Sequence, residues 1–191
     1  MTAAGLRAQL KQLLLEQQQP TIADLVTPAT VLALREHPHL NATFEDGRLQ
    51  VHQAVHVGLA VDADEGLIVP VVRNADQLPL PRLAEETKRL AQRARDNQVA
   101  LDDLRGGTFT VTSLGPQGED FFTPIINPPQ VAILGIGRLF AKLVLEQDRP
   151  IELQAMYLNL SFDHQVVDGA PAARFLQSVK RYLELPVGLM V

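Results

Sequence analysis

The segment LSFDHQVVDG at 160–169 holds the residues of this chain best suited to acid–base chemistry. His164 precedes Asp168 by four residues, and Gly169 follows at once. A neutral imidazole accepts a proton near neutral pH, so His164 is a candidate general base. The alternative is a core histidine with both nitrogens hydrogen-bonded, followed by an aspartate that only caps a helix. The spacing by itself does not prove catalysis.

The residues before His164 alternate as in a β-strand with one apolar face. Leu158, Leu160 and Phe162 share that face, and His164 continues the series. We therefore expect the imidazole where packed core gives way to a loop. Burial there disfavours the imidazolium, which keeps the ring neutral and able to take a proton.

The chain contains no cysteine, which excludes disulfides, thiolate metal sites and a cysteine nucleophile. Any thiol chemistry must therefore use thiols of the substrates. Gly135 and Gly137 lack the third glycine of a dinucleotide-binding turn. His37 and His39 have no acidic companion at ligand spacing, so we expect a solvated turn there and no metal site.

Composition indicates an ordinary globular protein of 191 residues, 46% hydrophobic and 20% charged. A net charge of -5 with both signs interspersed argues against nucleic acid and against anionic membrane surfaces as partners. No apolar run approaches the ~20 residues of a membrane helix, and the start lacks a secretory signal. We expect a soluble protein of the cytoplasm, or of the mitochondrial matrix in a eukaryote.

The elements that position His164 are predicted from apolar periodicity. Helices are expected at 3–18, from a Thr21 cap to about 33 with Pro28 kinking or delaying it, at 80–98 and at 170–184. Strands are expected at 41–44, 48–52, 55–62, 67–72, 108–114, 131–139 and 152–163. The inner side of the last helix is assigned to Ala173, Leu176, Val179, Lys180 and Leu183. Without repeat or linker, residues 1–191 form one α+β domain with a mixed sheet.

Four segments together resemble a known family. They are GLIVPVVRNAD (66–76), GGTFTVTSLG (106–115), INPPQVAILGIG (126–137) and LSFDHQVVDG, in this order. They are similar to the catalytic domains of the dihydrolipoamide acyltransferases, the cores of the 2-oxo acid dehydrogenase complexes. The HxxxDG motif is shared with the chloramphenicol acetyltransferases, whose fold the resemblance implies. The likeness runs from about Thr21 to the end of the chain.

The resemblance implies acyl transfer between dihydrolipoamide and coenzyme A. His164 takes a thiol proton, and Thr112 matches the hydroxyl that stabilises the oxyanion. Ser113 ranks second for that role because it faces the other side of its strand. Ser113, Leu114 and Gly115 are the expected coenzyme A contacts. Asp168 is expected to orient the loop through an ion pair with an Arg near the N-terminus of the domain.

The resemblance also implies a homotrimer in which neighbouring subunits supply the histidine and the hydroxyl. Larger cages form through apolar C-termini in related proteins, as Leu189, Met190 and Val191 would allow, although a terminus folded back fits equally. Partners would be the other enzymes of the complex and a lipoyl group carried on another domain or chain. DGAPAARFL favours an acetyl or branched-chain acyl group over succinyl.

This sequence departs from the family pattern in several places. The domain looks N-terminally short, the lipoyl and subunit-binding domains are not represented, and Arg7 cannot be matched to the Arg partner of Asp168. Gln165 replaces the usual Arg. A non-catalytic trimeric scaffold is therefore the alternative function. An acetyltransferase of the chloramphenicol type is a third, which the SLG and INPPQ segments disfavour.

Overall fold

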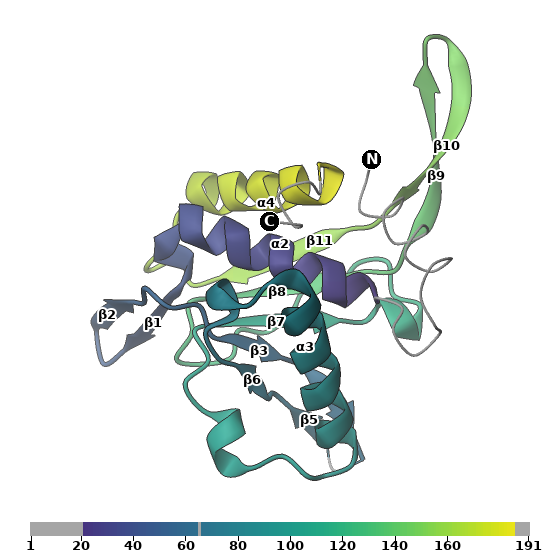
Figure 1. Ribbon diagram of the computed structural model, residues 1–191. Helices are drawn as coiled ribbons and strands as arrows, with labels where there is room; N and C mark the ends of the chain where they lie inside the picture. The colour runs from purple at the N-terminus through teal and green to yellow at the C-terminus, as the bar shows by residue number, and fades with distance from the viewer. Residues whose placement is uncertain (1–20, 65, 186–191) are drawn as a thin grey trace.

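A mixed five-stranded β-sheet forms the centre of the protein (Figure 1). The computed structural model describes residues 21–64 and 66–185; the expected helix at 3–18, Arg7 and residues 189–191 lie outside them. In spatial order the strands are β11 (Leu158–Phe162), β8 (Ala132–Ile136), β7 (Phe109–Ser113), β3 (Val57–Leu59) and β6 (Val71–Val72). The β8–β7 and β7–β3 pairs are parallel, and the two outer pairs are antiparallel. The expected α+β class with a mixed sheet is confirmed.

The helices gather over one face of this sheet (Figure 1). Helix α2 (Ile22–Glu36) packs against both α3 (Leu80–Arg95) and α4 (Gly169–Glu184). The rings of Phe109 on β7 and Phe175 on α4 lie 5.7 Å apart, which ties α4 to the sheet. Short 3-10 turns connect the larger elements: η2 (Pro38–Leu40), η3 (Ala75–Gln77), η4 (Leu101–Leu104) and η5 (Gly115–Gln117).

Helix α2 begins where its capping residue predicts. Thr21 accepts a hydrogen bond from the Asp24 backbone at 3.1 Å, and the Asp24 carboxylate accepts one from the Thr21 backbone at 2.8 Å. The helix runs on through Pro28 to Glu36, so the expected delayed start is wrong. The reciprocal cap satisfies the first turn, and Pro28 removes only one later hydrogen bond.

Two expected strands are each divided in the structure. The 55–62 segment splits into β3 and β4 (Val61–Ala63), and the 67–72 segment into β5 (Gly66–Ile68) and β6. β4 and β5 pair only with each other. The predicted hairpin of β1 (Ala42–Glu45) and β2 (Arg48–Val51) is confirmed, with Asp46 and Gly47 both at positive φ.

A projecting β-hairpin, β9 (Phe140–Glu146) with β10 (Arg149–Ala155), was not expected (Figure 1). The single strand predicted at 152–163 is wrong, because its first four residues belong to β10. The turn of this hairpin uses Gln147 and Asp148 at positive φ, where glycine, asparagine and aspartate are favoured. Gln147 is none of these and no glycine follows Asp148, so the turn signal was weaker than that of Asp46-Gly47.

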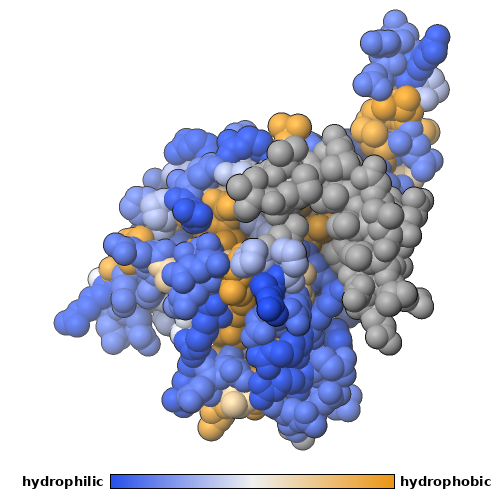
Figure 2. Space-filling model, viewed as in Figure 1, coloured by the Kyte–Doolittle hydropathy of each residue, from blue (hydrophilic) through white to orange (hydrophobic). Residues whose placement is uncertain are grey.

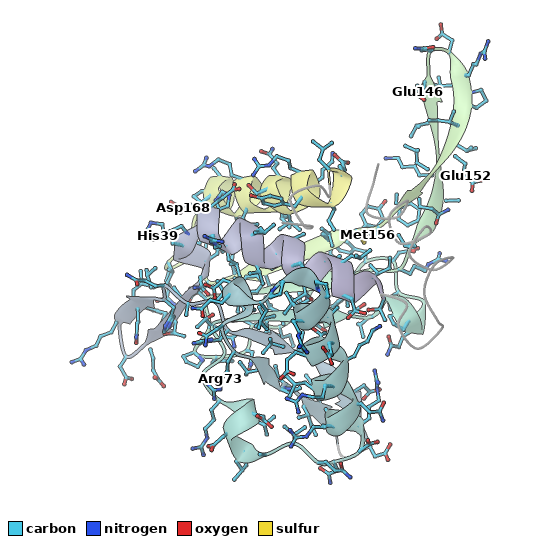
Figure 3. The ribbon with its side chains drawn as sticks, in the orientation of Figure 1. His39, Arg73, Glu146, Glu152, Met156 and Asp168 are labelled. Atoms are coloured by element: carbon cyan, nitrogen blue, oxygen red, sulfur yellow. The ribbon has the colours of Figure 1, made fainter. Side chains whose placement is uncertain are left out.

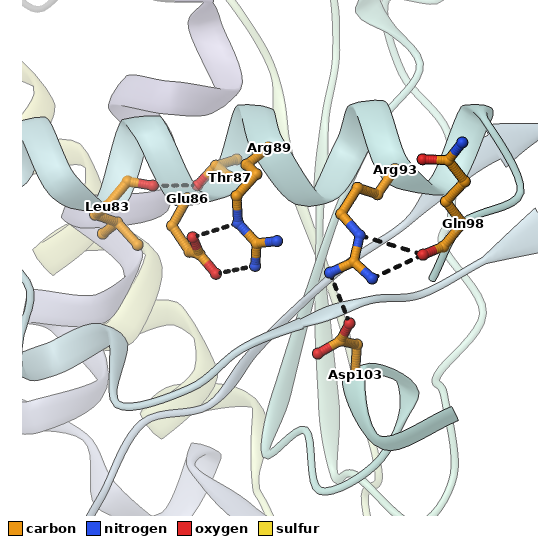
Figure 4. A network of polar contacts seen from close by, with 7 residues as sticks. All are labelled: Leu83, Glu86, Thr87, Arg89, Arg93, Gln98 and Asp103. Carbon is orange, nitrogen blue, oxygen red and sulfur yellow. Dashed lines mark hydrogen bonds and ion pairs between the residues drawn. The ribbon is translucent and has the colours of Figure 1, made fainter. Parts of the chain in front are cut away.

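The exposed face of α3 carries ion pairs, but they are not the pairs Arg82–Glu86 and Glu85–Arg89 that four-residue helical spacing predicts. Arg82 pairs with Glu85, and Arg89 with Glu86, at three-residue instead of four-residue spacing. Figure 4 shows the second pair, together with the Arg93 guanidinium that contacts the Gln98 carbonyl and Asp103. Both spacings bring helical side chains together, so the sequence alone could not choose between them.

The buried side of α4 is displaced from its predicted position. The buried residues are Ala172, Phe175, Ser178, Val179 and Leu183. Ala173 and Lys180, which were assigned to this face, are exposed. The error arose because Phe175 and Ser178 were left out of the apolar stripe. Ser178 is buried because its hydroxyl donates to Glu36 and lies 3.0 Å from His37 Nε2.

Histidines that are partly buried should make the fold less stable in acid. The Asn74 backbone N–H donates to His56 Nδ1 at 2.9 Å, which requires that nitrogen to be unprotonated. Burial, and then repulsion from Arg73, lower the pKa of His56 despite the opposing influence of Asp76; burial also lowers the pKa of His52. A histidine with a lowered folded pKa binds its proton more readily in the unfolded chain.

We therefore expect the free energy of unfolding to fall as pH drops below the unfolded histidine pKa of about 6.5. Denaturant unfolding at a series of pH values between neutral and mildly acidic measures this. The variant His56→Gln keeps an acceptor for the Asn74 N–H but cannot titrate, so its pH dependence should be weaker. Equal slopes for the variant and the parent protein would contradict this role of His56.

Candidate functional site

Thr112 lies near the end of β7, on the face of the sheet opposite the helices. It is paired with Gly135 of β8, which is paired in turn with Asn159 of β11, so the three residues share one face. The ring of Phe122 covers Gly135, where an added Cβ would lie 2.8 Å from it. A glycine here lets this ring lie directly on the sheet beside Thr112.

The hydroxyls of Thr112 and Ser113 differ in what they contact. Ser113 donates to the Ile136 carbonyl at 3.3 Å on the helix-covered face. Within the described part of the chain, the Thr112 hydroxyl has no hydrogen-bond partner. Both residues, with Leu114 and Gly115, line a cleft of about 1110 Å³. The Thr112 hydroxyl is therefore the one available to a ligand.

The SLG turn after Thr112 is held against the end of β8. The Leu114 N–H donates to the Ile136 carbonyl at 3.2 Å, and the Arg138 N–H donates to the Glu119 carbonyl at 2.8 Å. Arg138 also forms a two-pronged ion pair with Asp120, at 2.6 and 3.2 Å. Arg138 and Asp120 were missed by sequence reasoning, because they are 18 residues apart and only the sheet brings them together.

Gly137 allows the backbone at Asp120 to pack directly against the end of β8, so replacing Gly137 should lower the stability of the fold. A Cβ at Gly137 would lie 2.1 Å from the Asp120 carbonyl oxygen, a backbone atom with little freedom to move. We expect Gly137→Ala to lower the free energy of unfolding by about 1–3 kcal/mol or more. Denaturant unfolding measures it. Gly169→Ala is the matched control, because nothing lies within 4 Å of its Cβ position; equal effects would contradict the packing argument.

His164 lies in a turn and is not buried, contrary to expectation. Its side chain is 71% exposed in the single chain. The Asp163 N–H donates to the carbonyl of Val131, the residue before β8, and the Asp163 carbonyl accepts from the N–H groups of Val166 and Val167. The Asp163 carboxylate also accepts from the Gln165 N–H at 2.9 Å. Asp163 thereby ends the strand and turns His164 away from the core, a role that sequence reasoning missed.

Asp168 is placed to influence the His164 ring. Its Oδ1 lies 3.8 Å from His164 Nδ1, beyond hydrogen-bond range but close enough for a small movement to join them. Asp168 occupies the N-cap position of α4 without a capping hydrogen bond, so its carboxylate is not committed to the helix. In the part of the chain that the structure describes, no Arg or Lys pairs with it. The ring of Phe162 lies 5.5 Å from that of His164.

In one chain, Thr112 and His164 lie at opposite ends of the sheet. Thr112 is level with Gly135, whereas Phe162 is level with Ala132 and His164 follows it by two residues. Thr112 and His164 are therefore offset by five residues along the strands and by two strand spacings across the sheet, which corresponds to a distance of roughly 20 Å. Figure 3 shows Asp168 at the left of the helices and Met156, which precedes the first residue of β11, to the right of centre. The side chains of Thr112 and His164 therefore cannot meet within one subunit.

Other candidate sites are not supported. His37, expected in a solvated turn, is partly buried against Phe175 and lies 3.0 Å from the Ser178 hydroxyl. Residues 21–64 and 66–185 contain no group of three side chains placed to bind a metal. No helix among those residues has the length and apolar character needed to cross a bilayer.

Comparison with known proteins gives one consistent family. The model of the 2-oxoacid dehydrogenases acyltransferase (catalytic domain) matches residues 2–191, a longer stretch than the motifs indicated. The acetyltransferase component of the acetoin cleaving system of Bacillus subtilis is 43% identical over 90% of this chain. The succinyltransferase component of the 2-oxoglutarate dehydrogenase complex from the same organism is 40% identical over 100%. The chain spans 43% and 47% of these relatives, less than half of each.

Solved structures agree in fold. The cubic core of a pyruvate dehydrogenase multienzyme complex matches with a TM-score of 0.87 and 35% identity, covering 99% of this chain and 77% of that one. A chloramphenicol acetyltransferase matches at 0.57 with 15% identity over 96% of this chain and 84% of that one, which shows a shared fold.

One of these structures concerns catalysis directly. The Azotobacter vinelandii dihydrolipoamide acetyltransferase matches with a TM-score of 0.87 and 34% identity, over 99% of this chain and 77% of that one. It was studied for the roles of a serine, a histidine and an asparagine in its catalytic mechanism. In that protein the serine precedes the histidine by 52 residues, and the asparagine follows the histidine by four.

Proposed function

Because this chain belongs to the family of 2-oxoacid dehydrogenase acyltransferase catalytic domains, we propose that it transfers an acyl group between dihydrolipoamide and coenzyme A. The observation that carries the proposal is a spacing. Thr112 precedes His164 by 52 residues and Asp168 follows it by four, the separations of the serine, histidine and asparagine in the Azotobacter enzyme. Three positions on three different elements thus agree with one catalytic set.

The proposed reaction begins with proton transfer to His164. The imidazole takes the proton from the coenzyme A thiol, and the thiolate adds to the carbonyl carbon of the acyl-dihydrolipoamide thioester. The Thr112 hydroxyl donates to the oxyanion of the tetrahedral intermediate. The bond from carbon to the dihydrolipoamide sulfur then breaks, and that sulfur receives the proton from His164. The products are acyl-coenzyme A and free dihydrolipoamide.

The proposed site is assembled from two copies of the chain. Thr112 and His164 of one subunit are roughly 20 Å apart, so the Thr112 hydroxyl cannot act together with the His164 of the same subunit. The His164 side chain of one copy is 71% exposed and is not enclosed by the described residues of its own chain, so it is able to reach the Thr112 cleft of another copy. A homotrimer closes three such contacts in one ring, and larger cages can be built from trimers.

The cleft beside Thr112 suits a long anionic co-substrate such as coenzyme A. Its volume of about 1110 Å³ is slightly above the usual range of ligand pockets, which run to roughly 1,000 Å³. Lys88, Arg95 and Arg138 line it and are cations suited to phosphate. Lys88 and Arg138 have carboxylate partners, whereas Arg95 has no ion-pair partner among the described residues. Ser113, Leu114 and Gly115 form the wall next to Thr112.

A direct assay tests this function. The protein is mixed with S-acyl-dihydrolipoamide and coenzyme A, and the amount of acyl-coenzyme A formed is measured over time. Acetyl, isobutyryl and succinyl donors are compared, because similar relatives act on different acyl groups. We propose that the acetyl or branched-chain donor is preferred. No transfer from any donor by an assembled protein would refute the acyltransferase proposal.

A non-catalytic scaffold is the second candidate. One observation favours it. Among the described residues, Asp168 is the only polar partner of His164, and their closest atoms are 3.8 Å apart. A base without firm orientation is a poor catalyst. Under this alternative the chain assembles but neither binds coenzyme A nor transfers acyl groups, which calorimetric titration and the assay above would reveal together.

A further inference from the structure

The sheet face that holds Thr112 also holds an asparagine whose amide N–H group has no partner. Asn159 on β11 is level with Gly135 on β8, which is level in turn with Thr112. Asn159 is 8% exposed, and its Nδ2 forms no hydrogen bond with any described residue. Buried polar groups are nearly always hydrogen-bonded, so a buried donor of this kind is available to a ligand.

The ring of Phe122 stands between Thr112 and Asn159. An added Cβ at Gly135, the position between them, would lie 2.8 Å from Phe122 Cζ and 3.1 Å from its Cε2. The same Cβ would lie 3.3 Å from Cγ of Pro124, which is buried. The end of the Phe122 ring therefore fills the space that a side chain at Gly135 would occupy.

The loop that carries Phe122 is tied to the end of β8. Asp120, two residues earlier, pairs with Arg138 at 2.6 Å. The neighbouring Phe121 differs in its contacts, because its ring is 63% exposed and meets Tyr157 edge-on at 6.2 Å. Of the two phenylalanines, Phe122 is thus the one held over Gly135. A wall that is fixed before the substrate arrives can select a substrate by its size.

The acyl group of the substrate should lie against the Phe122 ring. In the proposed reaction the Thr112 hydroxyl binds the carbonyl oxygen, and Gly135 is only one strand spacing away, about 4.8 Å. On the other side, Ala60 donates its N–H to the Val111 carbonyl and lines the cleft assigned to coenzyme A. The surface around α3, another wall of that cleft, is mainly polar (Figure 2). The cleft suits the charged co-substrate, and the Phe122 side remains for the apolar acyl chain.

Acyl groups of different length would meet different residues on this face. Thr112 and Asn159 are two strand spacings apart, or about 10 Å. A succinyl group that is hydrogen-bonded at both ends, through two contacts of about 2.9 Å, spans a comparable distance. Its free carboxylate would then accept from the Asn159 amide. The Phe122 ring lies across this path, so a long acyl group cannot follow it.

We propose that Phe122 determines the acyl specificity of this chain. Its ring limits the donor to a group as small as acetyl. The ring also separates Thr112 from the Asn159 amide, which binds the free carboxylate of a succinyl group once the ring is removed. The inference rests on the proposed function, and it narrows the preferred donor from acetyl or branched-chain to acetyl.

Removing the ring tests the proposal. The values of kcat/KM are compared for acetyl, isobutyryl and succinyl donors. The parent protein should favour acetyl over both others, and Phe122→Ala should lower each preference by about 10-fold or more, a typical effect of pocket size. Phe121→Ala is the matched control, because it removes the same atoms from a ring that faces Tyr157; its ratios should equal those of the parent. A parent that favours succinyl, or unchanged ratios in Phe122→Ala, would overturn the proposal.

A milder variant guards against misfolding of Phe122→Ala. Phe122→Leu keeps an apolar side chain over Gly135 but is smaller than the ring. Sedimentation velocity and denaturant unfolding show whether each variant keeps the assembly and stability of the parent. Phe122→Leu should move the isobutyryl-to-acetyl ratio in the same direction as Phe122→Ala, and a ratio equal to that of the parent counts against the ring as the wall.

A double variant tests the part assigned to Asn159. In the Phe122→Ala protein, Asn159→Leu keeps a side chain of similar size and removes the amide. The gain for the succinyl donor should then be lost, whereas the gain for isobutyryl should remain, because only succinyl has a second acceptor. If the succinyl gain persists without the amide, Asn159 does not bind the carboxylate.

The same measurements distinguish this proposal from the acyltransferase function itself. Transfer with donor ratios that do not respond to Phe122 refutes the specificity and leaves the function standing. An assembled parent protein and an assembled Phe122→Ala protein that transfer no acyl group from any donor refute the function, and the acyl site with it.

Discussion

Replacing His164 with alanine is expected to lower kcat for acyl transfer by about 10²- to 10⁴-fold, the usual contribution of a general base. The fold should not change, because the side chain is 71% exposed and its interactions among the described residues are with Asp168 and the Phe162 ring. The rate of acyl-coenzyme A formation at saturating substrates measures the loss. Sedimentation of the same sample checks that the subunits stay associated.

The control for this variant is His39→Ala, which removes another exposed histidine on η2. Its kcat should match that of the parent protein. Near-full transfer by an assembled His164→Ala protein would eliminate His164 as the base.

Replacing Thr112 with valine is the second variant with a large expected effect. Valine keeps the branched shape for β7 and removes only the hydroxyl, so the oxyanion loses a donor and kcat should fall about 10²- to 10³-fold. Thr112→Ser keeps the hydroxyl and should retain activity, as the serine of the Azotobacter enzyme suggests. Ser113→Ala is the neighbouring control, because that hydroxyl already donates to the Ile136 carbonyl. An active Thr112→Val protein would exclude this donor.

Mixing the two inactive variants tests whether a site spans two subunits. When His164→Ala and Thr112→Val chains are co-assembled in equal amounts, random pairing gives about one quarter of the sites an intact histidine and an intact hydroxyl. Activity near a quarter of the parent rate is therefore expected from two preparations that are each nearly inactive. No recovery in verified mixed assemblies would contradict the shared site, whatever the activity of the parent protein.

Much of the local structure could be predicted from the sequence, because it depends on neighbouring residues. Thr21 and Asp24 are three residues apart and cap α2 as their types predict. Asp46 and Gly47 form the expected turn, since both tolerate positive φ. The hairpin of β9 and β10 was not foreseen, because the first positive-φ position of its turn is Gln147, a residue type that seldom marks a turn, and no glycine follows at Asp148.

The order of chemical groups along the chain was determined by the sequence: a hydroxyl at Thr112, an imidazole at His164, and a carboxylate at Asp168 four residues later. Their placement was decided by the tertiary structure. The exposure of His164 follows from Asp163, which bonds to Val131 just before β8 and then starts a turn. The separation of His164 from Thr112 follows from the strand order β7, β8, β11 and its register. Strand pairing joins segments distant in the chain through backbone hydrogen bonds, which any residue except proline can make. The sequence therefore determines which reactive groups are present, and only the folded sheet determines the distance between Thr112 and His164.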